Sequence, residues 1–382
     1  MQTQIDPCHA AGSDGLPPHV TRVTRSALPG EVAAEENTLL STDPPAISLE
    51  RAAEIAEEVF GVRGQFRALS SERDANFHLR LADGTQALLK ITNAREDRAV
   101  TAMQTKALIH LAAVAPELPV QRICTTRRGE PWEIVTEASG EDHVVRLLTY
   151  LDGTMLVGAT AGPELHRGIG SLLARVTKGL RGFFHPAAGH ELQWDMKHAA
   201  KLRPLLGAVD DAELQRRLTR MLDRFDAEIA PKLPLLRAQI VHNDLNPHNV
   251  VVDNPLATRP TGVIDFGDMV HTPLACDLAV ACSYHLGSGK DPLHPVAEIV
   301  GGYASVLPLE REEIDLLPEL IQLRHMTTLA ISAWRAARYP ENAGYILRNA
   351  PASLRGLDCI DQIGTRETAA LLRQAVETAR GE

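Results

Sequence analysis

The chain has 382 residues, of which 44% are hydrophobic and 23% charged, a composition typical of a globular protein and a length that predicts two lobes or domains. A formal net charge of −10 argues against nucleic acid or an anionic membrane as the main partner. No apolar run approaches the ~20 residues of a membrane span. Five scattered cysteines without C-x-x-C spacing, and a start without the apolar core of a secretory signal, predict a cytoplasmic protein with reduced thiols. Nothing in the sequence indicates an oligomeric state.

Residues 1–46 are rich in Pro, Gly, Ser, Thr and Glu. Such a segment buries too little apolar surface to offset its ordering entropy, so we expect a disordered or loosely docked tail. Apolar residues then recur at helical spacing over residues 48–60, which predicts a helix. Strands are predicted over residues 65–69, 76–81 and 85–91, with Ala82-Asp83-Gly84 as the hairpin turn between the last two.

Lys90 lies in the third of these predicted strands. Strand alternation places it on one face with Leu88, whereas Ala87, Leu89 and Ile91 take the other face. Kinases use a lysine of the third strand to contact the α- and β-phosphates of the nucleotide. The alternative is a solvated lysine on an exposed strand. Lys90 comes one hairpin after a polar loop and ahead of a predicted helix, and this position favours the phosphate contact.

The polar loop, residues 70–76, lies between the first two predicted strands, where a phosphate-covering loop belongs. It contains no glycine, so it differs from the glycine-rich loop of protein kinases. Phosphate contacts would come from the hydroxyls of Ser70 and Ser71 and from backbone N–H groups.

A helix is predicted over residues 95–113, and strands return around residues 132–135 and 144–150. Beyond Asp152-Gly153 the pattern is mainly helical. We therefore expect an α+β, two-lobed, protein-kinase-like fold. A small β-rich N-terminal lobe (47–151) and a larger, mainly helical C-terminal lobe (152–382) would enclose the nucleotide between them.

Two motifs in the second half of the chain match the requirements of phosphoryl transfer. The first is Val241-His242-Asn243-Asp244-Leu245-Asn246-Pro247-His248-Asn249, and sixteen positions after its end comes Asp265-Phe266-Gly267. In kinases, an Asp of such a loop accepts the proton of the substrate hydroxyl, while an Asn and the D-F-G Asp hold the metal. Here Asp244 would be the base, and Asn249 and Asp265 the ligands of Mg²⁺, a cation that prefers oxygen donors.

Each motif alone also fits a turn, because Asn, Asp and Gly dominate turns. However, short apolar β runs flank both motifs, at residues 238–241, 249–252 and 261–264. These runs would bring the Asn and the second Asp side by side. Together the two motifs favour a catalytic site.

These motifs resemble the aminoglycoside phosphotransferase and choline kinase family of the kinase-like fold, and within it the hydroxylysine kinase type. The resemblance runs from about Ile47 to the C-terminus. Besides the two motifs, it rests on Arg146-Leu147-Leu148-Thr149-Tyr150-Leu151, Leu192-Gln193-Trp194-Asp195, Ser332-Ala333-Trp334-Arg335 and Pro340-Glu341-Asn342.

The resemblance implies Mg²⁺ as cofactor and ATP or GTP as phosphoryl donor. It implies that Lys90 binds phosphates, that His242 braces the catalytic loop and that Asp277 anchors this loop from the following helix. The backbone of Thr149, Tyr150 and Leu151 would contact the purine.

One position departs from the family pattern. Where the family offers a Glu to pair with the lysine, the register here places Gln104. An amide can hydrogen-bond an ammonium group but cannot neutralise it, so Glu96 or Asp97 would have to supply the charge.

The implied reaction transfers a γ-phosphoryl group to the hydroxyl of a small amino-bearing alcohol or amino acid. 5-Hydroxylysine is the first candidate acceptor, and homoserine, choline, ethanolamine and aminoglycosides are the alternatives. An acidic cleft would suit a cationic acceptor, and Arg324 could bind its carboxylate. The remaining predicted acceptor residues are acidic or aromatic, the aromatic ones packing on an amine or its stem: Asp268, Asp195, Trp194, Tyr284 and Trp334.

Trp194 and Trp334 could instead be core aromatics, and Arg324 could instead form an internal salt bridge.

Two other functions of the chain are alternatives to a kinase. A pseudokinase that only binds nucleotide would be expected to lack Asp244, Asn249 or Asp265, yet all three are present. A metal-dependent hydrolase would leave Lys90 unexplained, and the chain lacks H-x-H ligand spacing around His242 and His248.

Overall fold

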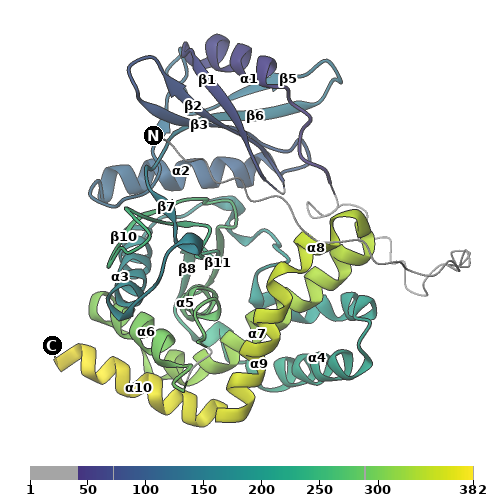
Figure 1. Ribbon diagram of the computed structural model, residues 1–382, viewed down its shortest axis with the longest axis vertical. Coiled ribbons are helices and arrows are strands. Elements are labelled where there is room, and N and C mark those ends of the chain that lie inside the picture. Colours follow the sequence, from purple (N-terminus) through teal and green to yellow (C-terminus); the bar gives the residue numbers. More distant parts are fainter. Residues whose placement is uncertain (1–41, 72, 288–289, 382) are drawn as a thin grey trace, which may run out of the picture. The chain divides into compact units, whose positions relative to one another are not determined.

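The computed structural model describes residues 42–71, 73–287 and 290–381 (Figure 1). The predicted tail, residues 1–46, therefore lies outside the described residues except for its last five positions. None of the helices in the described ranges is both long and apolar enough to cross a membrane.

An antiparallel sheet dominates the first half of the described chain (Figure 1). Its strands follow the order β1-β2-β3-β6-β4, and β5 pairs with the free edge of β6 next to β4. The strands are β1 (Gly64–Leu69), β2 (Ala75–Leu81), β3 (Gln86–Ile91), β4 (Ile123–Cys124), β5 (Glu133–Thr136) and β6 (Asp142–Thr149). The hairpin turn predicted between the second and third strands is present, with Gly84 at φ +87° and the backbone N–H of Thr85 donating to Asp83.

Helix α1 (Leu49–Ile55) begins after Ser48, whose hydroxyl accepts from the N–H of Arg51, and continues as a π-helical turn, η2 (Ala56–Phe60). Its apolar side packs on one face of the sheet. Ala87, Leu89 and Ile91 of β3 are buried in that layer, whereas Lys90 faces the cavity described below. The alternation predicted for β3 is therefore confirmed.

Helix α2 (Arg98–Val114) runs beneath the sheet and beside the helical half of the chain (Figure 1). It begins three residues later than predicted, because the side chain of Asp97 accepts from the N–H of Ala99 and caps the helix there. Its buried apolar residues belong to the large hydrophobic core that continues through the C-terminal half, and Gln104 lies near the middle of the helix.

The C-terminal half is mainly helical, as expected. Its α-helices are α3 (Pro163–Gly179), α4 (Ala212–Arg224), α5 (Leu274–Ser283), α6 (His294–Val306), α7 (Arg311–Arg338), α8 (Ala343–Ile346), α9 (Ala350–Ile363) and α10 (Thr365–Gly381). Short 3-10 and π segments connect them: η3 (Leu156–Gly158), η4 (Pro186–Gly189), η5 (Met196–Ala208), η6 (Phe225–Ile229), η7 (Leu233–Leu235), η8 (Pro340–Asn342) and η9 (Leu347–Asn349).

Short strands in this half hold the two motifs. They are β7 (Thr154–Met155), β8 (Ala238–Val241), β9 (Val250–Val252), β10 (Pro260–Val263) and β11 (Val270–Pro273). Strand β9 lies between β10 and β7, and β8 pairs with β11. The N–H of Ile264 donates to the carbonyl of Asn249 at 3.0 Å, so the residues that follow β10 lie beside those that precede β9. This pairing brings the second motif next to the first.

Candidate active site

The catalytic loop runs from β8 to β9 and is braced by His242. The N–H of Asp244 donates to His242 Nδ1 at 3.3 Å, so Nε2 carries the proton and donates to the carbonyl of Ile264 at 3.1 Å. Burial lowers the pKa of His242 and favours this neutral ring. One imidazole thus joins the start of the first motif to the residue that precedes Asp265.

Asp277 of α5 holds the same loop from the other side. Its Oδ1 accepts from the backbone N–H of Asn243 at 2.7 Å, and Asn243 adopts a left-handed φ of +62°. Burial raises the pKa of Asp277 to about 7, and backbone hydrogen bonds from Asn243 and His242 oppose that rise.

Asp277→Ala should lower the free energy of unfolding by about 1–3 kcal/mol, because it leaves the buried N–H of Asn243 without its acceptor. Asp277→Asn keeps an acceptor oxygen and should lose less. Denaturant unfolding of both variants against the unmodified chain measures the difference. Equal losses in the two variants would show that the hydrogen bond to Asn243 is not what the carboxylate contributes.

The side chains of Asp244 and Asn249 are in direct contact. Asn249 Nδ2 donates to Oδ2 of Asp244 at 2.8 Å and to its backbone carbonyl at 2.9 Å, and Asn246 Nδ2 donates to the same Oδ2 at 2.9 Å. Because the amide nitrogen of Asn249 faces Asp244, its Oδ1 is turned away from the carboxylate. Burial and the charge of Asp268 raise the pKa of Asp244 to about 7, against the opposing charge of Arg324.

Asp265 follows β10 at a left-handed φ of +59°, and its side chain is 45% exposed toward the cavity. Its backbone N–H donates to Gln121 Oε1, while Gln121 Nε2 lies 3.4 Å from the carbonyl of Thr149. The charge of Lys90 lowers the pKa of Asp265 and outweighs the partial desolvation of the carboxylate, which acts to raise that pKa. The carboxylate is therefore ionised.

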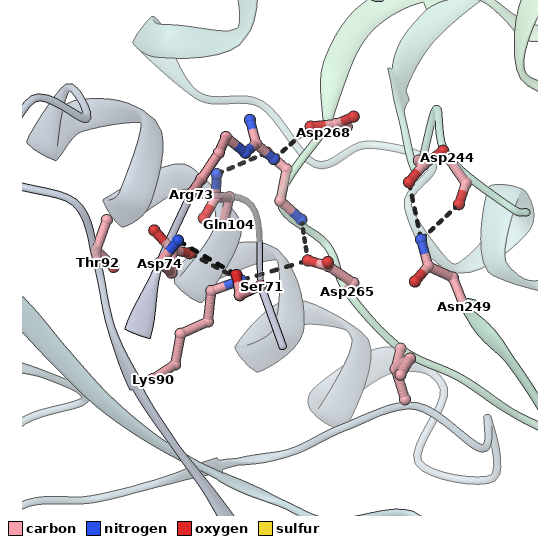
Figure 2. A network of polar contacts seen from close by, with 12 residues as sticks. Ser71, Arg73, Asp74, Lys90, Thr92, Gln104, Asp244, Asn249, Asp265 and Asp268 are labelled. Atoms are coloured by element: carbon pink, nitrogen blue, oxygen red, sulfur yellow. Dashed lines mark hydrogen bonds and ion pairs between the residues drawn. The ribbon is translucent and has the colours of Figure 1, made fainter. Parts of the chain in front are cut away.

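Lys90 is shared by two carboxylates (Figure 2). Its Nζ lies 3.1 Å from Asp74 Oδ2 and 3.3 Å from Asp265 Oδ1. Burial acts to lower the pKa of Lys90, but the charges of Asp265 and Asp74 outweigh it and raise that pKa. Asp74, at the end of the polar loop, also accepts from the backbone N–H of Asn93 at 3.0 Å. Asp74 therefore joins the polar loop to β3 through Lys90, and to the segment that follows β3 through the backbone N–H of Asn93.

This arrangement corrects the expected partner of Lys90. Asp97 caps α2 instead, and the ion pairs of Lys90 are with Asp74 and Asp265 rather than with Glu96 or Asp97. Gln104 does occupy the cavity wall, but its Nε2 donates to the carbonyl of Gly267 and its Oε1 accepts from Arg146 at 3.2 Å. The compensating charge comes from Asp74, which the sequence analysis did not single out.

The polar loop supplies a second cation beside Lys90, Arg73 (Figure 2). Its Nη2 lies 2.6 Å from Asp268 Oδ1, so the loop between β1 and β2 is bonded to the segment that follows Asp265. The charge of Asp268 raises the pKa of Arg73 still further. Ser71 also serves this loop, because its hydroxyl accepts from the N–H of Asp74 at 3.3 Å. Asp268 is therefore already paired with a cation.

Arg324 of α7 lies against the catalytic loop. Its Nη2 is 3.3 Å from both Asp244 Oδ1 and the hydroxyl of Tyr284, its Nη1 donates to the carbonyl of Trp194, and its guanidinium lies 4.8 Å from the centre of the Trp194 ring. The side chain is only 3% exposed. The structure thus contains the internal salt bridge that was the alternative for Arg324, and its partner is Asp244 itself.

These side chains line one cavity of about 840 Å³. The predicted residues on its wall are Ser70, Ser71, Lys90, Gln104, Trp194, Asp244, Asn249, Asp265, Asp268, Tyr284 and Arg324. His242 and Asp277 lie behind the catalytic loop. At the hinge Leu148 lines the cavity, whereas Thr149, Tyr150 and Leu151, which follow it in the chain, are absent from its wall.

Two predicted acceptor residues lie elsewhere. Asp195 is fully buried, caps η5, and pairs with the Thr272 hydroxyl at 2.8 Å and with Lys197 at 3.2 Å. Trp334 packs against the hydrophobic core, which was its alternative. Neither side chain lines the cavity, so the structure does not bring these two residues together with the other predicted acceptor residues.

Comparison with known proteins assigns the family. The sequence profile of the phosphotransferase enzyme family (APH) matches residues 65–313, more than half of the chain. The chain belongs to this family and is a phosphotransferase.

Individual relatives agree with this assignment. Hydroxylysine kinase of Xenopus laevis is 28% identical over 346 residues, which cover 85% of this chain and 92% of the relative. Homoserine kinase of Chelativorans sp. (strain BNC1) is 30% identical over 274 residues, 67% of this chain and 76% of the relative. An amicoumacin kinase solved with AMP-PNP, Ca²⁺ and Ami superposes with a TM-score of 0.59 at 14% identity over 81% of this chain and 94% of that one. The expected kinase-like fold is confirmed.

Proposed function

We propose that the chain transfers the γ-phosphoryl group of ATP or GTP to the hydroxyl of 5-hydroxylysine. The observation that carries the proposal is the convergence of Asp244, Asn249 and Asp265 on one cavity, with Lys90 beside Asp265. The choice of acceptor is supported by the similarity to hydroxylysine kinase, which extends over most of both chains.

The donors in the cavity fit a Mg²⁺ ion. Asp265 presents an ionised, partly exposed carboxylate, and the amide of Asn249 is oriented by Asp244 so that its oxygen is turned away from that carboxylate. Among the described residues, no group of three or more His, Cys, Asp or Glu side chains forms a metal cage. Two protein oxygens suit Mg²⁺, which commonly takes its remaining ligands from phosphates and water. When bound there, the ion would neutralise charge on the phosphates.

Lys90 and the polar loop would hold the phosphates of the nucleotide. Lys90 is positioned by two carboxylates, and Arg73 adds a second cation at the same end of the cavity. Hydroxyls of Ser70 and Ser71 line the wall beside them. The purine would lie toward Leu148 and the hinge backbone of Thr149, Tyr150 and Leu151. Because this backbone can serve adenine or guanine, ATP and GTP are both proposed donors.

Asp244 would act as the general base. The acceptor oxygen forms a bond to the γ-phosphorus as the bond from that phosphorus to the β–γ bridging oxygen breaks, the hydroxyl proton passes to Asp244, and the nucleoside diphosphate leaves. A positioned base contributes roughly 10²–10⁴-fold. A pKa of about 7 matches such a role near neutral pH, and Asn246 and Asn249 hold the carboxylate in place.

Arg324 would position this base. It is buried, lies against Asp244 and is itself held by Tyr284 and Trp194. The ring of Trp194 and the Tyr284 hydroxyl remain on the cavity wall, where they could contact the amine-bearing stem of the acceptor.

Arg324→Gln should lower kcat by up to about 100-fold, because a misplacement of about 1 Å at the reacting group can cost that much. KM for the nucleotide should stay unchanged. Steady-state kinetics with both substrates varied would separate the roles. A rise confined to KM for the acceptor would assign Arg324 to the acceptor carboxylate instead, and equal effects on both substrates would make it a structural residue.

Homoserine is the second proposed acceptor, because the homoserine kinase of Chelativorans sp. is 30% identical to this chain.

The proposed function can be tested by measuring the release of nucleoside diphosphate in the presence of Mg²⁺. ATP and GTP would each be combined with 5-hydroxylysine, homoserine, choline, ethanolamine and kanamycin. Stimulation by 5-hydroxylysine alone would support the proposal in full. Stimulation by another alcohol would keep the mechanism and replace the acceptor. Tight nucleotide binding without turnover of any acceptor would contradict the role of Asp244.

A further inference from the structure

A buried arginine on the cavity wall has no part in the mechanism above. Arg146 of β6 lies opposite Lys90 of β3 in the sheet, lines the cavity and is only 3% exposed. Among the described residues, its guanidinium donates only to neutral side chains, namely Gln104 Oε1 at 3.2 Å, the Thr105 hydroxyl at 3.4 Å and the Thr92 hydroxyl at 3.2 Å. Burying a charge without a directly paired carboxylate is costly, which indicates that these hydrogen bonds have a function.

Arg146 fixes the orientation of the Gln104 side chain on α2. A guanidinium can only donate hydrogen bonds, and a backbone carbonyl can only accept them. Because Oε1 of Gln104 accepts from Arg146, its Nε2 is directed to the carbonyl of Gly267, to which it donates at 2.9 Å. Gln104 is 4% exposed, so water has little access to either bond. The amide thus joins β6 and α2 to the segment that follows Asp265.

Gly267 transmits this connection to Asp265. Its backbone N–H donates to Asp265 Oδ1 at 3.2 Å while its carbonyl accepts from Gln104, so both of its polar groups are held. A Cβ atom on Gly267 would lie 2.9 Å from the same Oδ1, so a side chain there would displace the carboxylate. The orientation of Asp265, the proposed ligand of Mg²⁺, therefore depends on Gln104 through Gly267.

The departure of this chain from the family pattern then has a physical explanation. An ionised glutamate in place of Gln104 could still accept from Arg146. However, it could not donate to Gly267, and it would turn a second acceptor toward that carbonyl. Glutamine satisfies both neighbours at once. Lys90 needs no partner on α2, because two other carboxylates already pair with it.

We propose that Gln104, oriented by Arg146, is a positioning residue that holds Asp265 in place for the Mg²⁺ of the nucleotide complex. This inference rests on the proposed function and deepens it, because it assigns the side chains that set the geometry of the metal site from outside. Residues that support a metal ligand in this way typically contribute roughly 10–100-fold to metal affinity.

The test measures nucleotide binding at a series of Mg²⁺ concentrations, without any acceptor. Calorimetry with AMP-PNP and GMP-PNP gives the Mg²⁺ concentration at which binding is half-maximally strengthened. Gln104→Glu and Gln104→Met should each raise this concentration roughly 10–100-fold, because each removes the donor to Gly267. Without Mg²⁺, the nucleotide affinity of Gln104→Met should stay close to that of the unmodified chain.

Lys106→Gln is the matched control for these variants. It lowers the net charge by the same amount as Gln104→Glu, and Lys106 is exposed on the same helix and does not line the cavity. This control should behave like the unmodified chain. Denaturant unfolding of each variant establishes the temperature at which all of them are folded.

The part played by Arg146 is tested by a double-mutant cycle. Arg146→Met should also raise the required Mg²⁺ concentration, and it should add little to Gln104→Met, because the arginine acts through the amide. Independent effects of the two substitutions would overturn the role of Arg146. The two Gln104 variants decide the role of the glutamine even where Arg146→Met does not fold.

Unchanged Mg²⁺ dependence in both Gln104 variants would overturn the inference and leave the proposed function intact. A shift confined to one of the two variants would overturn it as well, because both lack the donor. If Mg²⁺ did not strengthen nucleotide binding in the unmodified chain, the metal role of Asp265 and this inference would both be wrong. Conversely, the expected shifts in a chain that phosphorylates none of the tested alcohols would support this inference and contradict the proposed acceptor.

Discussion

Asp244→Asn is expected to lower kcat by about 10²–10⁴-fold, the contribution of a positioned general base. Asparagine keeps the shape of the side chain but cannot take the hydroxyl proton. Affinity for the nucleotide should change little, because Lys90 and Asp265 are untouched. Single-turnover phosphoryl transfer, with nucleotide affinity measured separately by titration, would check both statements.

Stability must be measured alongside. Asp244 is the carboxylate partner of Arg324, whose side chain is 3% exposed, and breaking a buried pair can cost about 3–5 kcal/mol. Rates therefore have to be compared at a temperature where both proteins are folded. Asp253→Asn is a suitable control, since Asp253 is exposed in the loop after β9 and does not line the cavity. Near-normal turnover of Asp244→Asn would show that Asp244 is not the general base.

Asp265→Asn is expected to uncouple nucleotide binding from Mg²⁺. The variant retains an oxygen but loses the charge that pairs with Lys90 at 3.3 Å and would hold the metal. Altering residues that merely support a metal ligand typically costs 10–100-fold in affinity or activity, so loss of a ligand charge should cost at least about 100-fold in kcat.

The measurement is nucleotide affinity over a range of Mg²⁺ concentrations. In the unmodified chain Mg²⁺ should strengthen binding of ATP or GTP, and in Asp265→Asn this dependence should largely disappear. The Asp253→Asn control should behave like the unmodified chain. If Mg²⁺ still strengthened binding equally in Asp265→Asn, the metal ligands would have to be sought among other residues.

Local patterns in the sequence were sufficient for most elements of the first half of the described chain. Alternation in residues 85–91 correctly separated Lys90 from Leu89, because one face of β3 packs on α1 and the other faces the cavity. Ala82-Asp83-Gly84 correctly indicated a hairpin, because Gly84 needs a positive φ. The start of α2 was less accurate, since Asp97 rather than the periodicity sets it.

The residues around the two motifs were harder to predict. Asp74 pairs with Lys90, sixteen residues away in the chain, only because the register of β2 with β3 places Asn76 opposite Lys90. Gln121 and Arg73 reach the segment around Asp265 from more distant positions. Asp195 and Trp334 looked equally suitable for the site, yet packing turned one into a helix cap and the other toward the core.

The sequence by itself determined the class of fold and the phosphotransferase motifs, because periodicity and motif spacing are local properties of the chain. Only the tertiary structure decided which charges face one another. It paired Arg324 with Asp244 and Asp74 with Lys90. It also brought Arg335, Arg348 and Arg355 to the wall of the same cavity. Electrostatic partners depend on distances across the fold, and residues that share a cavity here come from strands and helices far apart in the chain.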